Sequence, residues 1–340
     1  MELALYCPET GYYETKKDNV GRRGDFYTSV SVGNLFGELL AFQFSEWLEE
    51  IKARDSQISN LNLIEAGSHD GKLAADILNW LSKNRPKLFS KINYCIIEPS
   101  PRRQQWQKEM LKDFSQKVFW FAGFENSKHV GIIFSNELLD AFPVRRFGWN
   151  AKVKNWFEWG VVVENQNFIW AKIQNPESRT RNPELDLPAE LLSVLPDNYT
   201  VEISESARNW WREAANILER GKLLAIDYGF TDEEMFSPAR TNGTSRAYFR
   251  HHFADDILAN AGEQDLTAHV NFSAIQKTGE EAGLQTEFFS TQTKFLTQIL
   301  EKTVKGKNFS KWTSARARQF QTLTHPEHLG RAFKVLVQSR

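Results

Sequence analysis

The sequence predicts an α/β fold in which helices cover both faces of a mostly parallel sheet. Short apolar runs of strand length alternate with longer segments whose apolar residues recur at helical spacing. The runs are apolar without polar alternation, which is typical of parallel strands that are buried on both faces. A chain of 340 residues is long enough for two domains, or for one large α/β domain with insertions.

Charge and composition exclude several classes of function. Lys and Arg number 42 against 43 Asp and Glu, so the net charge is −1. We therefore expect no binding to nucleic acid or to an anionic lipid surface, which needs an excess of positive charge. Aromatic residues make up 13% of the chain, which favours a packed core over disorder. No apolar run approaches the roughly 18 residues of a membrane span, so we expect no membrane insertion.

Residues 1–60 are predicted to form an N-terminal arm and a helix that cover one side of the site. Residues 1–33 contain several turn-forming Pro and Gly residues, which indicates an extended arm. From Asn34 to Ile51 the apolar residues share one stripe, which predicts a helix.

The core is predicted to occupy residues 61–143 and 199–340. Its first part has strands at 61–64, 94–97, 118–121 and 132–134, with helices between the first three. In its second part, a helix over 206–220 is expected to end at Gly221, because glycine favours helix termini. Strands follow at 223–226, 286–289 and 333–337.

Residues 144–198 interrupt this rhythm and are predicted to form a β-rich insertion. Its tryptophans are more than one small insertion can hide, so they indicate either a surface for a protein partner or packing against the sheet. They are Trp149, Trp156, Trp159 and Trp170.

The turn after the first strand has features of a nucleoside site. Gly67 and Gly71 would let the backbone approach a ligand at a helix N-terminus. Glu98 ends the second strand, where a carboxylate can accept both hydroxyls of a ribose. Because Glu65 precedes the turn and no pyrophosphate cradle is present, the pattern favours the cationic S-adenosylmethionine over NAD. The cofactor-binding candidates here are Glu65, Gly67, Ser68, Gly71, Glu98 and Pro99. An ordinary βα turn is the alternative.

Several sequence blocks recur in a known order along nearly the whole chain. They are Pro8 to Tyr13, Gly24 to Ser29 followed by Leu35-Phe36-Gly37-Glu38, Asn136 to Val144, Asp227-Tyr228-Gly229, and Asp265 to Phe272. Together they resemble the MidA-like S-adenosylmethionine-dependent methyltransferases. That family includes a mitochondrial complex I assembly factor that is a protein arginine methyltransferase. The resemblance implies a class I methyltransferase (Rossmann-like) fold, with a seven-stranded sheet whose last strand is antiparallel. It also implies S-adenosylmethionine as the cofactor and a protein substrate.

The sequence departs from the family pattern at two places. His69 stands where glycine is expected in the cofactor loop, and Val30-Ser31 replaces a Pro-Glu pair. The first change could alter cofactor affinity, and the second could alter the lid or the substrate pocket.

Three side chains follow the fourth strand, where the resemblance puts the methyl group. Glu137 and Asp140 could orient a guanidinium group, and Asn136 could add a carbonyl acceptor, so all three are catalytic candidates. The alternative is that Asn136 and Asp140 cap the following turn.

The remaining candidates come from the arm and from the second half of the core. The resemblance implies that Gly24, Asp25 and Phe26 close over the cofactor. The candidates for walls of the substrate pocket are Tyr12, Tyr13, Tyr228 and His269. Turn, core and hydrogen-bonding roles are the structural alternatives for these residues.

Compartment and partners follow from a few further observations. Cys7 and Cys95 are the two cysteines, and we expect free thiols in a reducing compartment, the cytoplasm. No metal site is expected, because His251-His252 has no further ligand at suitable spacing. A homodimer is left open.

We therefore expect an S-adenosylmethionine-dependent methyltransferase that acts on a protein nitrogen, with arginine implied by the resemblance alone. The alternatives are a catalytically silent scaffold that binds a protein partner, a small-molecule methyltransferase, and an NAD-dependent oxidoreductase. The sequence leaves the methyl acceptor open.

Overall fold

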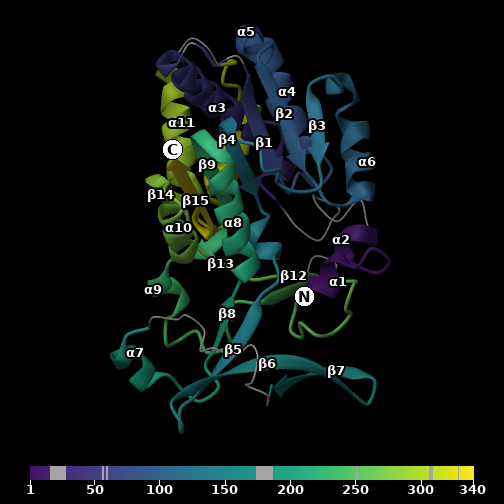
Figure 1. The fold of residues 1–340 in the computed structure, drawn as a ribbon, viewed down its shortest axis with the longest axis vertical. Coiled ribbons are helices and arrows are strands. Elements are labelled where there is room, and N and C mark those ends of the chain that lie inside the picture. Colours follow the sequence, from purple (N-terminus) through teal and green to yellow (C-terminus); the bar gives the residue numbers. More distant parts are fainter. Residues whose placement is uncertain are drawn as a thin grey trace.

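A mostly parallel sheet in the order β14-β15-β9-β4-β1-β2-β3 forms the centre of the molecule, and the short β13 pairs with β9 (Figure 1). The structure is a computed structural model that describes residues 1–15, 28–55, 57–58, 60–173, 187–249, 252–305, 309–327 and 329–340. The strands are β1 (Leu61–Ala66), β2 (Ile92–Ile97), β3 (Val118–Phe121), β4 (His129–Asn136), β9 (Leu218–Phe230), β13 (Val270–Asn271), β14 (Gln285–Thr291) and β15 (Phe333–Ser339). The predicted α/β class is confirmed, with seven strands on the main path and β13 beside them.

Strand direction gathers the ends of several strands at one edge of this sheet. Neighbouring strands from β9 through β4, β1 and β2 to β3 are all parallel. The last strand, β15, is antiparallel to both β9 and β14, as expected. Because parallel strands end at the same edge, the residues that follow β1, β2 and β4 lie together with the end of β9.

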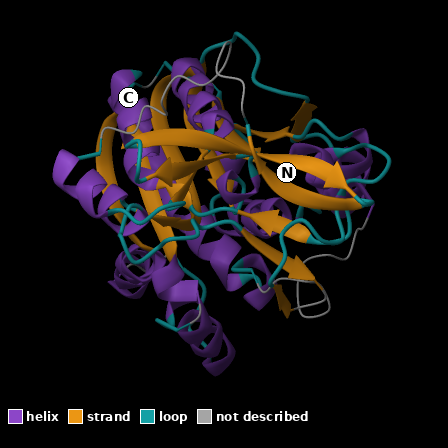
Figure 2. Ribbon diagram, turned by 90° about the horizontal axis from the view of Figure 1, so that it is seen from below, coloured by secondary structure: helices purple, strands orange, loops and turns teal. Residues whose placement is uncertain are grey.

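Helices cover both faces of the sheet (Figure 2). On one face, α3 (Leu35–Arg54), α4 (Lys72–Asn84) and α11 (Gln292–Lys305) share a core with Leu63 of β1. On the other face, α8 (Glu205–Ile217) and α10 (Phe272–Glu281) share a second core with the next residue, Ile64. Successive strand residues point to opposite faces, so an uninterrupted apolar run supplies both cores at once.

The remaining helices are short connections or lie at the ends of the chain. They are α1 (Glu2–Tyr6), α2 (Tyr12–Thr15), α5 (Pro86–Phe89), α6 (Pro101–Met110), α7 (Ala189–Val194), α9 (Asp232–Met235), α12 (Ser314–Thr324) and α13 (Leu329–Ala332), with 3-10 helices η1 (Val30–Val32), η2 (Lys112–Phe114) and η3 (Leu139–Ala141). Among the described residues, no helix is both long enough and apolar enough to cross a membrane.

Gly221 does not end a helix, which corrects the expectation from the sequence. Helix α8 ends at Ile217, and Gly221 lies inside β9 with φ +139°. A Cβ atom at this position would come within 1.8 Å of the carbonyl oxygen of Gly131 in β4. The two glycines therefore let β4 and β9 approach each other closely. In the sequence, a glycine that serves this purpose looks the same as a glycine that ends a helix.

The insertion forms its own antiparallel sheet in the order β7-β6-β5-β8, at the lower end of the molecule in Figure 1. Its strands are β5 (Arg145–Asn150), β6 (Asn155–Glu164), β7 (Asn167–Lys172) and β8 (Thr200–Ile203). Strand β8 lies beyond residue 198, in the segment that the sequence assigns to the core, yet it pairs with β5. The division at residue 198 stays a prediction.

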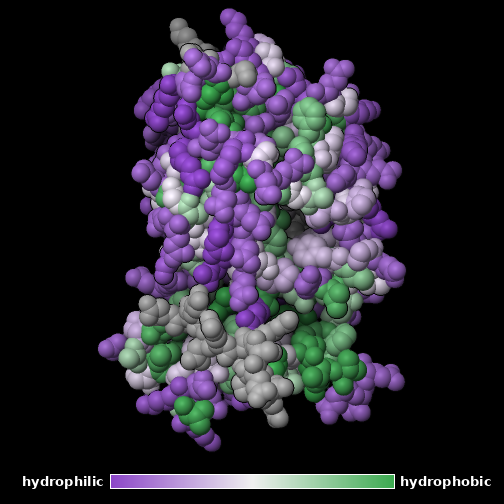
Figure 3. Space-filling model, in the orientation of Figure 1, coloured by the Kyte–Doolittle hydropathy of each residue, from purple (hydrophilic) through white to green (hydrophobic). Residues whose placement is uncertain are grey.

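The apolar surface of the insertion lies on its far hairpin. Trp149 is only 4% exposed, and the other three tryptophans are partly buried, so the aromatic surface is smaller than the sequence suggests. Most of the exposed apolar side chains belong to the β6–β7 hairpin, where Val163 is 68% and Phe168 is 49% exposed. Figure 3 shows this apolar area at the lower right.

Candidate active site

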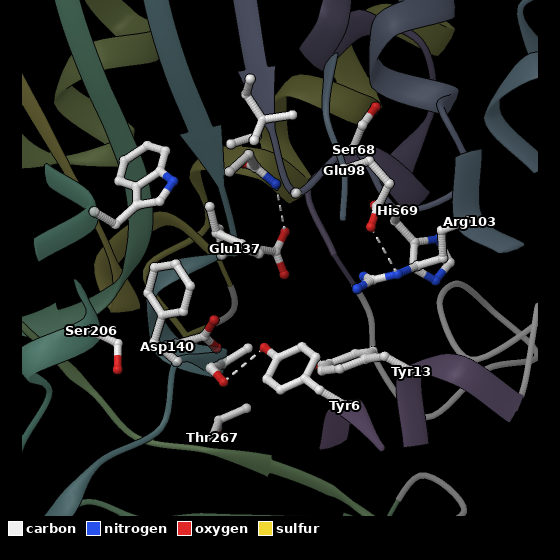
Figure 4. A pocket seen from close by; sticks show the side chains of 18 of the residues that line it. Tyr6, Tyr13, Ser68, His69, Glu98, Arg103, Glu137, Asp140, Ser206 and Thr267 are labelled. Carbon is white, nitrogen blue, oxygen red and sulfur yellow. Dashed lines mark hydrogen bonds and ion pairs between the residues drawn. The ribbon is translucent and has the colours of Figure 1, made fainter. Parts of the chain in front are cut away.

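One cavity of about 880 Å³ lies at the edge where the core strands end (Figure 4). Its lining includes the predicted catalytic residues Asn136, Glu137 and Asp140 and the predicted cofactor residues Glu65, Gly67, Ser68, Glu98 and Pro99. It also includes the predicted pocket residues Tyr12, Tyr13, Tyr228 and His269. Gly71 is outside the lining, and Gly24, Asp25 and Phe26 lie outside the described residues.

The turn after β1 has a left-handed backbone at three positions. Gly67, His69 and Gly71 have φ values of +76°, +46° and +86°. A Cβ atom at Gly67 would be 3.0 Å from the Leu138 side chain, so glycine is favoured there by tight packing as well as by conformation. His69 lacks that freedom, which explains why glycine is the expected residue at its position.

Glu65 is buried at the end of β1 and accepts a hydrogen bond from the Tyr94 hydroxyl. Burial raises the pKa of Glu65 to about 7. The carboxylate therefore holds a proton readily, and a cation placed beside it would favour its ionised form.

Glu98, at the end of β2, has a cationic partner that the sequence analysis missed. Its carboxylate lies 3.4 Å from the Arg103 guanidinium and accepts hydrogen bonds from the Ser100 amide and from Gln107. Burial raises the pKa of Glu98, and Arg103 opposes that shift. The start of α6 is the sequence feature that could have identified Arg103 as a site residue. Ser100 caps this helix by accepting from the Arg103 amide, which puts Arg103 in the first turn, beside the end of β2.

Glu137 lies at a strained position immediately after β4. Its φ is +53°, and its amide donates to the Ile226 carbonyl of β9. Its Oε1 accepts hydrogen bonds from the Asn136 side chain and, at 3.4 Å, from the Ser29 amide. Asn136 Oδ1 is buried and has no hydrogen-bond partner among the described residues. A strained backbone and an orphaned acceptor at a cavity wall are typical of a ligand site.

Asp227 fixes the turn that carries these groups. Its Oδ2 accepts hydrogen bonds from the amides of Leu138 and Leu139, and its Oδ1 accepts one from the Tyr228 amide. Burial raises the pKa of Asp227 to about 7, whereas the three amides oppose the shift. Asp227 was not among the predicted site residues, although its sequence block was noted.

Four carboxyl groups therefore share one corner, in which Asp140, Asp227 and Asp265 are buried and Glu137 is partly exposed. Burial, reinforced by Asp227, raises the pKa of Glu137 to about 8. Burial also raises the pKa of Asp140, and Asp227, Asp265 and Glu137 add to that shift. Eight acidic side chains but only two arginines line the cavity in the described part of the chain. Among the described residues, no group of three or more His, Cys, Asp or Glu side chains is arranged so that it could hold a metal ion.

Two tyrosines from the N-terminal helices close one side of this corner. The Tyr13 hydroxyl donates to Asp265 Oδ1 at 2.7 Å, and the Tyr6 hydroxyl donates to the Ala141 carbonyl at 2.9 Å. Their rings lie 5.6 Å apart, next to the Arg103 side chain in Figure 4. Tyr6 was not predicted, because a single tyrosine on a five-residue helix carries no distinguishing pattern.

His269 is stacked on Phe230, with the ring centroids 4.4 Å apart. Burial lowers the pKa of His269 to about 4, and the nearby Arg246 adds to the effect. The imidazole is therefore neutral near pH 7.

Comparison with known proteins identifies the group to which the chain belongs. Residues 39–290 match the model of a family described as "Putative S-adenosyl-L-methionine-dependent methyltransferase". The chain belongs to this family. The resemblance noted from the sequence is therefore confirmed, and the protein is an S-adenosylmethionine-dependent methyltransferase.

Solved structures agree with this assignment. A protein from Burkholderia thailandensis that is described as a "likely methyl transferase", bound to S-adenosyl-homocysteine, is 29% identical to this methyltransferase. The superposition has a TM-score of 0.83 and covers 100% of this chain and 86% of that chain. A native structure of an uncharacterised superfamily protein from the same organism has 27% identity and a TM-score of 0.80, covering 100% and 85% of the two chains.

Curated relatives carry a more specific name. Protein arginine methyltransferase NDUFAF7, mitochondrial, from Danio rerio is 28% identical, covering 98% of this chain and 81% of that protein. The Drosophila melanogaster homolog is 26% identical, covering 83% and 66% of the two chains. This chain spans about two thirds of the length of several such relatives, at 64–66%.

These names contradict the cytoplasmic location expected from the sequence, because the relatives are mitochondrial proteins. The expectation was wrong because free cysteines indicate a reducing environment, and that property does not single out the cytoplasm.

The cofactor of this methyltransferase is S-adenosylmethionine, and the cavity suits it. Gly67 leaves space where any larger residue would meet Leu138, and Asn136 Oδ1 offers an unused acceptor. The excess of acidic side chains matches the positive sulfonium and amino groups of the cofactor.

Proposed function

We propose that this methyltransferase modifies a guanidinium nitrogen of an arginine in a protein. The observation that supports the proposal is the acidic corner of Glu137 and the buried Asp140 and Asp265, whose carboxyl groups face a cavity with a large excess of acidic side chains. A guanidinium carries five N–H donors and a permanent positive charge, so it satisfies several carboxylates at once. The name of the NDUFAF7 relatives agrees with this acceptor.

The cofactor half of the cavity is assigned to the ends of β1 and β2. We propose that Glu65, Gly67, Ser68, Glu98 and Pro99 hold the cofactor. Gly71 would support their turn, and Gly24, Asp25 and Phe26 would contribute from the arm. When bound, S-adenosylmethionine supplies an activated methyl group. The chain must therefore bind the acceptor, orient it and exclude water.

Glu137 has the central role in the acceptor half. Its Oε1 is already engaged by Asn136 and Ser29, so Oε2 is the atom that would accept N–H donors from the guanidinium. A guanidinium nitrogen that gains a methyl group must lose one proton. Glu137 can take that proton in its ionised form, which a bound guanidinium favours, because its pKa of about 8 lies close to neutral pH. Asp140 and Asn136 would orient the same group.

Two parts of the chain are proposed to select the acceptor. Residues 1–60 would cover the site, with Tyr12 and Tyr13 as walls, and Tyr228 and His269 would line the opposite side. The β-rich insertion, residues 144–198, would contact the protein substrate. Its exposed β6–β7 hairpin supports that role, because exposed apolar area often marks a protein interface.

The test is a comparison of acceptor classes under identical conditions. The purified protein receives S-adenosylmethionine with a labelled methyl group and either arginine-containing peptides, the same peptides with lysine in place of arginine, or free arginine. Labelled methylarginine in the arginine peptides alone is the expected result. Labelling of lysine peptides or of free arginine at an equal rate would contradict the proposal.

A further inference from the structure

A small three-stranded sheet carries four polar side chains into the acceptor half of the cavity. Its strands β10 (Arg246–Phe249), β11 (His252–Ala254) and β12 (Asp265–Thr267) are antiparallel in the order β11-β10-β12. Arg246 lies opposite Thr267, and Tyr248 lies opposite Asp265. Residues directly opposite each other share a face of a sheet, as do alternate residues of one strand. All four accordingly line the cavity.

The two charged members of this face differ in environment. Asp265 is 2% exposed and accepts the Tyr13 hydroxyl, so it belongs to the buried acidic corner. Arg246 is exposed, and its guanidinium lies 5.9 Å from the centre of the Phe253 ring. Arg246 forms no ion pair with any residue in the described ranges. Of the two arginines that line the cavity in the described part of the chain, Arg103 is paired with Glu98, which leaves Arg246 for a ligand.

The segment before Arg246 is fixed by a buried carboxylate from the insertion. Glu202 of β8 accepts hydrogen bonds from the amides and hydroxyls of Thr244 and Ser245. Its side chain is 2% exposed and lies 3.5 Å from the Arg146 Nε. Thr244 in turn accepts a hydrogen bond from the His269 amide. Glu202 therefore ties the insertion sheet to the strand that presents Arg246.

We propose that Arg246 is a specificity-determining residue that binds an acidic side chain one or two positions from the target arginine. This inference rests on the proposed function. Arg246 and Asp265 are diagonal neighbours across the strand pair, a separation of about 7 Å between Cα atoms. An extended peptide advances about 3.3 Å per residue, so an acid one or two residues from the arginine reaches Arg246 while the arginine occupies the acidic corner. Glu202 is the positioning residue that holds this arrangement.

The test uses three peptides that are identical except for the residues one and two positions on either side of the target arginine, which are all Glu, all Gln or all Lys. The wild-type protein should have a KM about fivefold lower for the Glu peptide than for the Gln peptide, the gain expected from one accessible ion pair. The Lys peptide should be the poorest. Arg246→Gln should remove this ranking, and Arg246→Glu should invert it in favour of the Lys peptide.

Matched variants separate positioning from general charge effects. Glu202→Gln should weaken the preference for the Glu peptide, mainly through KM, and leave the affinity for S-adenosyl-homocysteine unchanged. Arg318→Gln removes an exposed charge on α12, outside the cavity lining, and should preserve the full ranking.

Two results would overturn the proposal. The first is an unchanged peptide ranking in both Arg246 variants, with arginine still methylated, which leaves the proposed function intact. The second is a loss of S-adenosyl-homocysteine binding in Arg246→Gln, which would assign Arg246 to the cofactor. If the wild-type protein methylates none of the arginine peptides, the proposed function and this inference both fail.

Discussion

The Tyr13 hydroxyl donates a 2.7 Å hydrogen bond to Asp265 Oδ1 and so ties helix α2 to strand β12. The two residues are 252 positions apart in the sequence. One buried contact thus joins the N-terminal arm to the acidic corner. Any movement of the arm changes the environment of a carboxylate that we assign to the acceptor site.

Tyr13→Phe should loosen the arm. The substitution removes a hydrogen bond from a buried carboxylate, which costs about 1–2 kcal/mol in the free energy of unfolding. Hydrogen exchange in α1 and α2 should accelerate. Tyr6→Phe is the comparison variant: it removes the link from α1 to the Ala141 carbonyl but leaves Asp265 paired, so exchange in α2 should accelerate more in Tyr13→Phe than in Tyr6→Phe. Equal exchange rates in wild type and Tyr13→Phe would contradict a tethering role.

Glu137→Gln should reduce kcat for arginine peptides by about a hundredfold, the lower range for loss of a positioned acid–base group. Affinity for S-adenosyl-homocysteine, measured by calorimetry, should stay within about twofold, because the substitution preserves shape. Glu213→Gln neutralises another acid in the cavity lining and should have little effect. If Glu137→Gln methylates at the wild-type rate, Glu137 is not the orienting group.

The acidic corner should make the ligand-free protein less stable as the pH rises. The folded-state pKa values of Glu137 and Asp227, about 8 and about 7, lie above the ordinary values of such groups. The folded state therefore holds protons that the unfolded state releases, and stability falls between about pH 4.5 and pH 8. Urea unfolding across this range should show the decline, and Glu137→Gln should reduce its slope. An identical slope in the variant would contradict the raised pKa of Glu137.

His69 should tolerate glycine better than a branched residue. At φ +46° a β-branched side chain is strained, so His69→Val should lose about 1–2 kcal/mol in unfolding free energy. His69→Gly relieves strain but adds freedom to the unfolded chain, so its stability should stay within about 1 kcal/mol of wild type. Chemical denaturation of the three proteins provides the comparison. A stable valine variant would show that the turn can relax.

Gly221→Ala should be severely destabilising, by about 3 kcal/mol or more, because the added methyl group would collide with the backbone of β4. Gly123→Ala is the control, because no neighbouring atom lies within 4 Å of a Cβ there. Thermal unfolding of both variants tests the close approach of β4 and β9. Similar Tm values would argue against it.

The alternation of strands and helices along the chain could be predicted because each core strand contributes apolar side chains to both faces of the sheet. Apolar runs such as residues 94–97 carry that signal without any partner being known. The pairing of β8 with β5 could not be predicted, since the hydrogen-bond partner of a short strand depends on the path of the whole insertion.

The site was predictable where residues follow strand ends. Glu65, Glu98 and Glu137 line the cavity because parallel strands end at one edge. Asp265 and Arg246 reach it through tertiary packing of a small sheet in a loop-rich segment, and periodicity carries no information about such approaches. The roles of all these residues stay predictions.

Strand β9 runs for 13 residues from the close glycine contact at one end to the cavity wall at the other. Side chains alternate along it, so Asp227 supports the turn below Glu137 while Tyr228 faces the cavity. A single-residue deletion near Gly221 would put the Tyr228 phenol where the Asp227 carboxylate holds three amides, and a single-residue insertion would put the Ile226 side chain there. The chemistry at the cavity is thus sensitive to the length of the Gly221 end of β9, which lies outside the cavity lining.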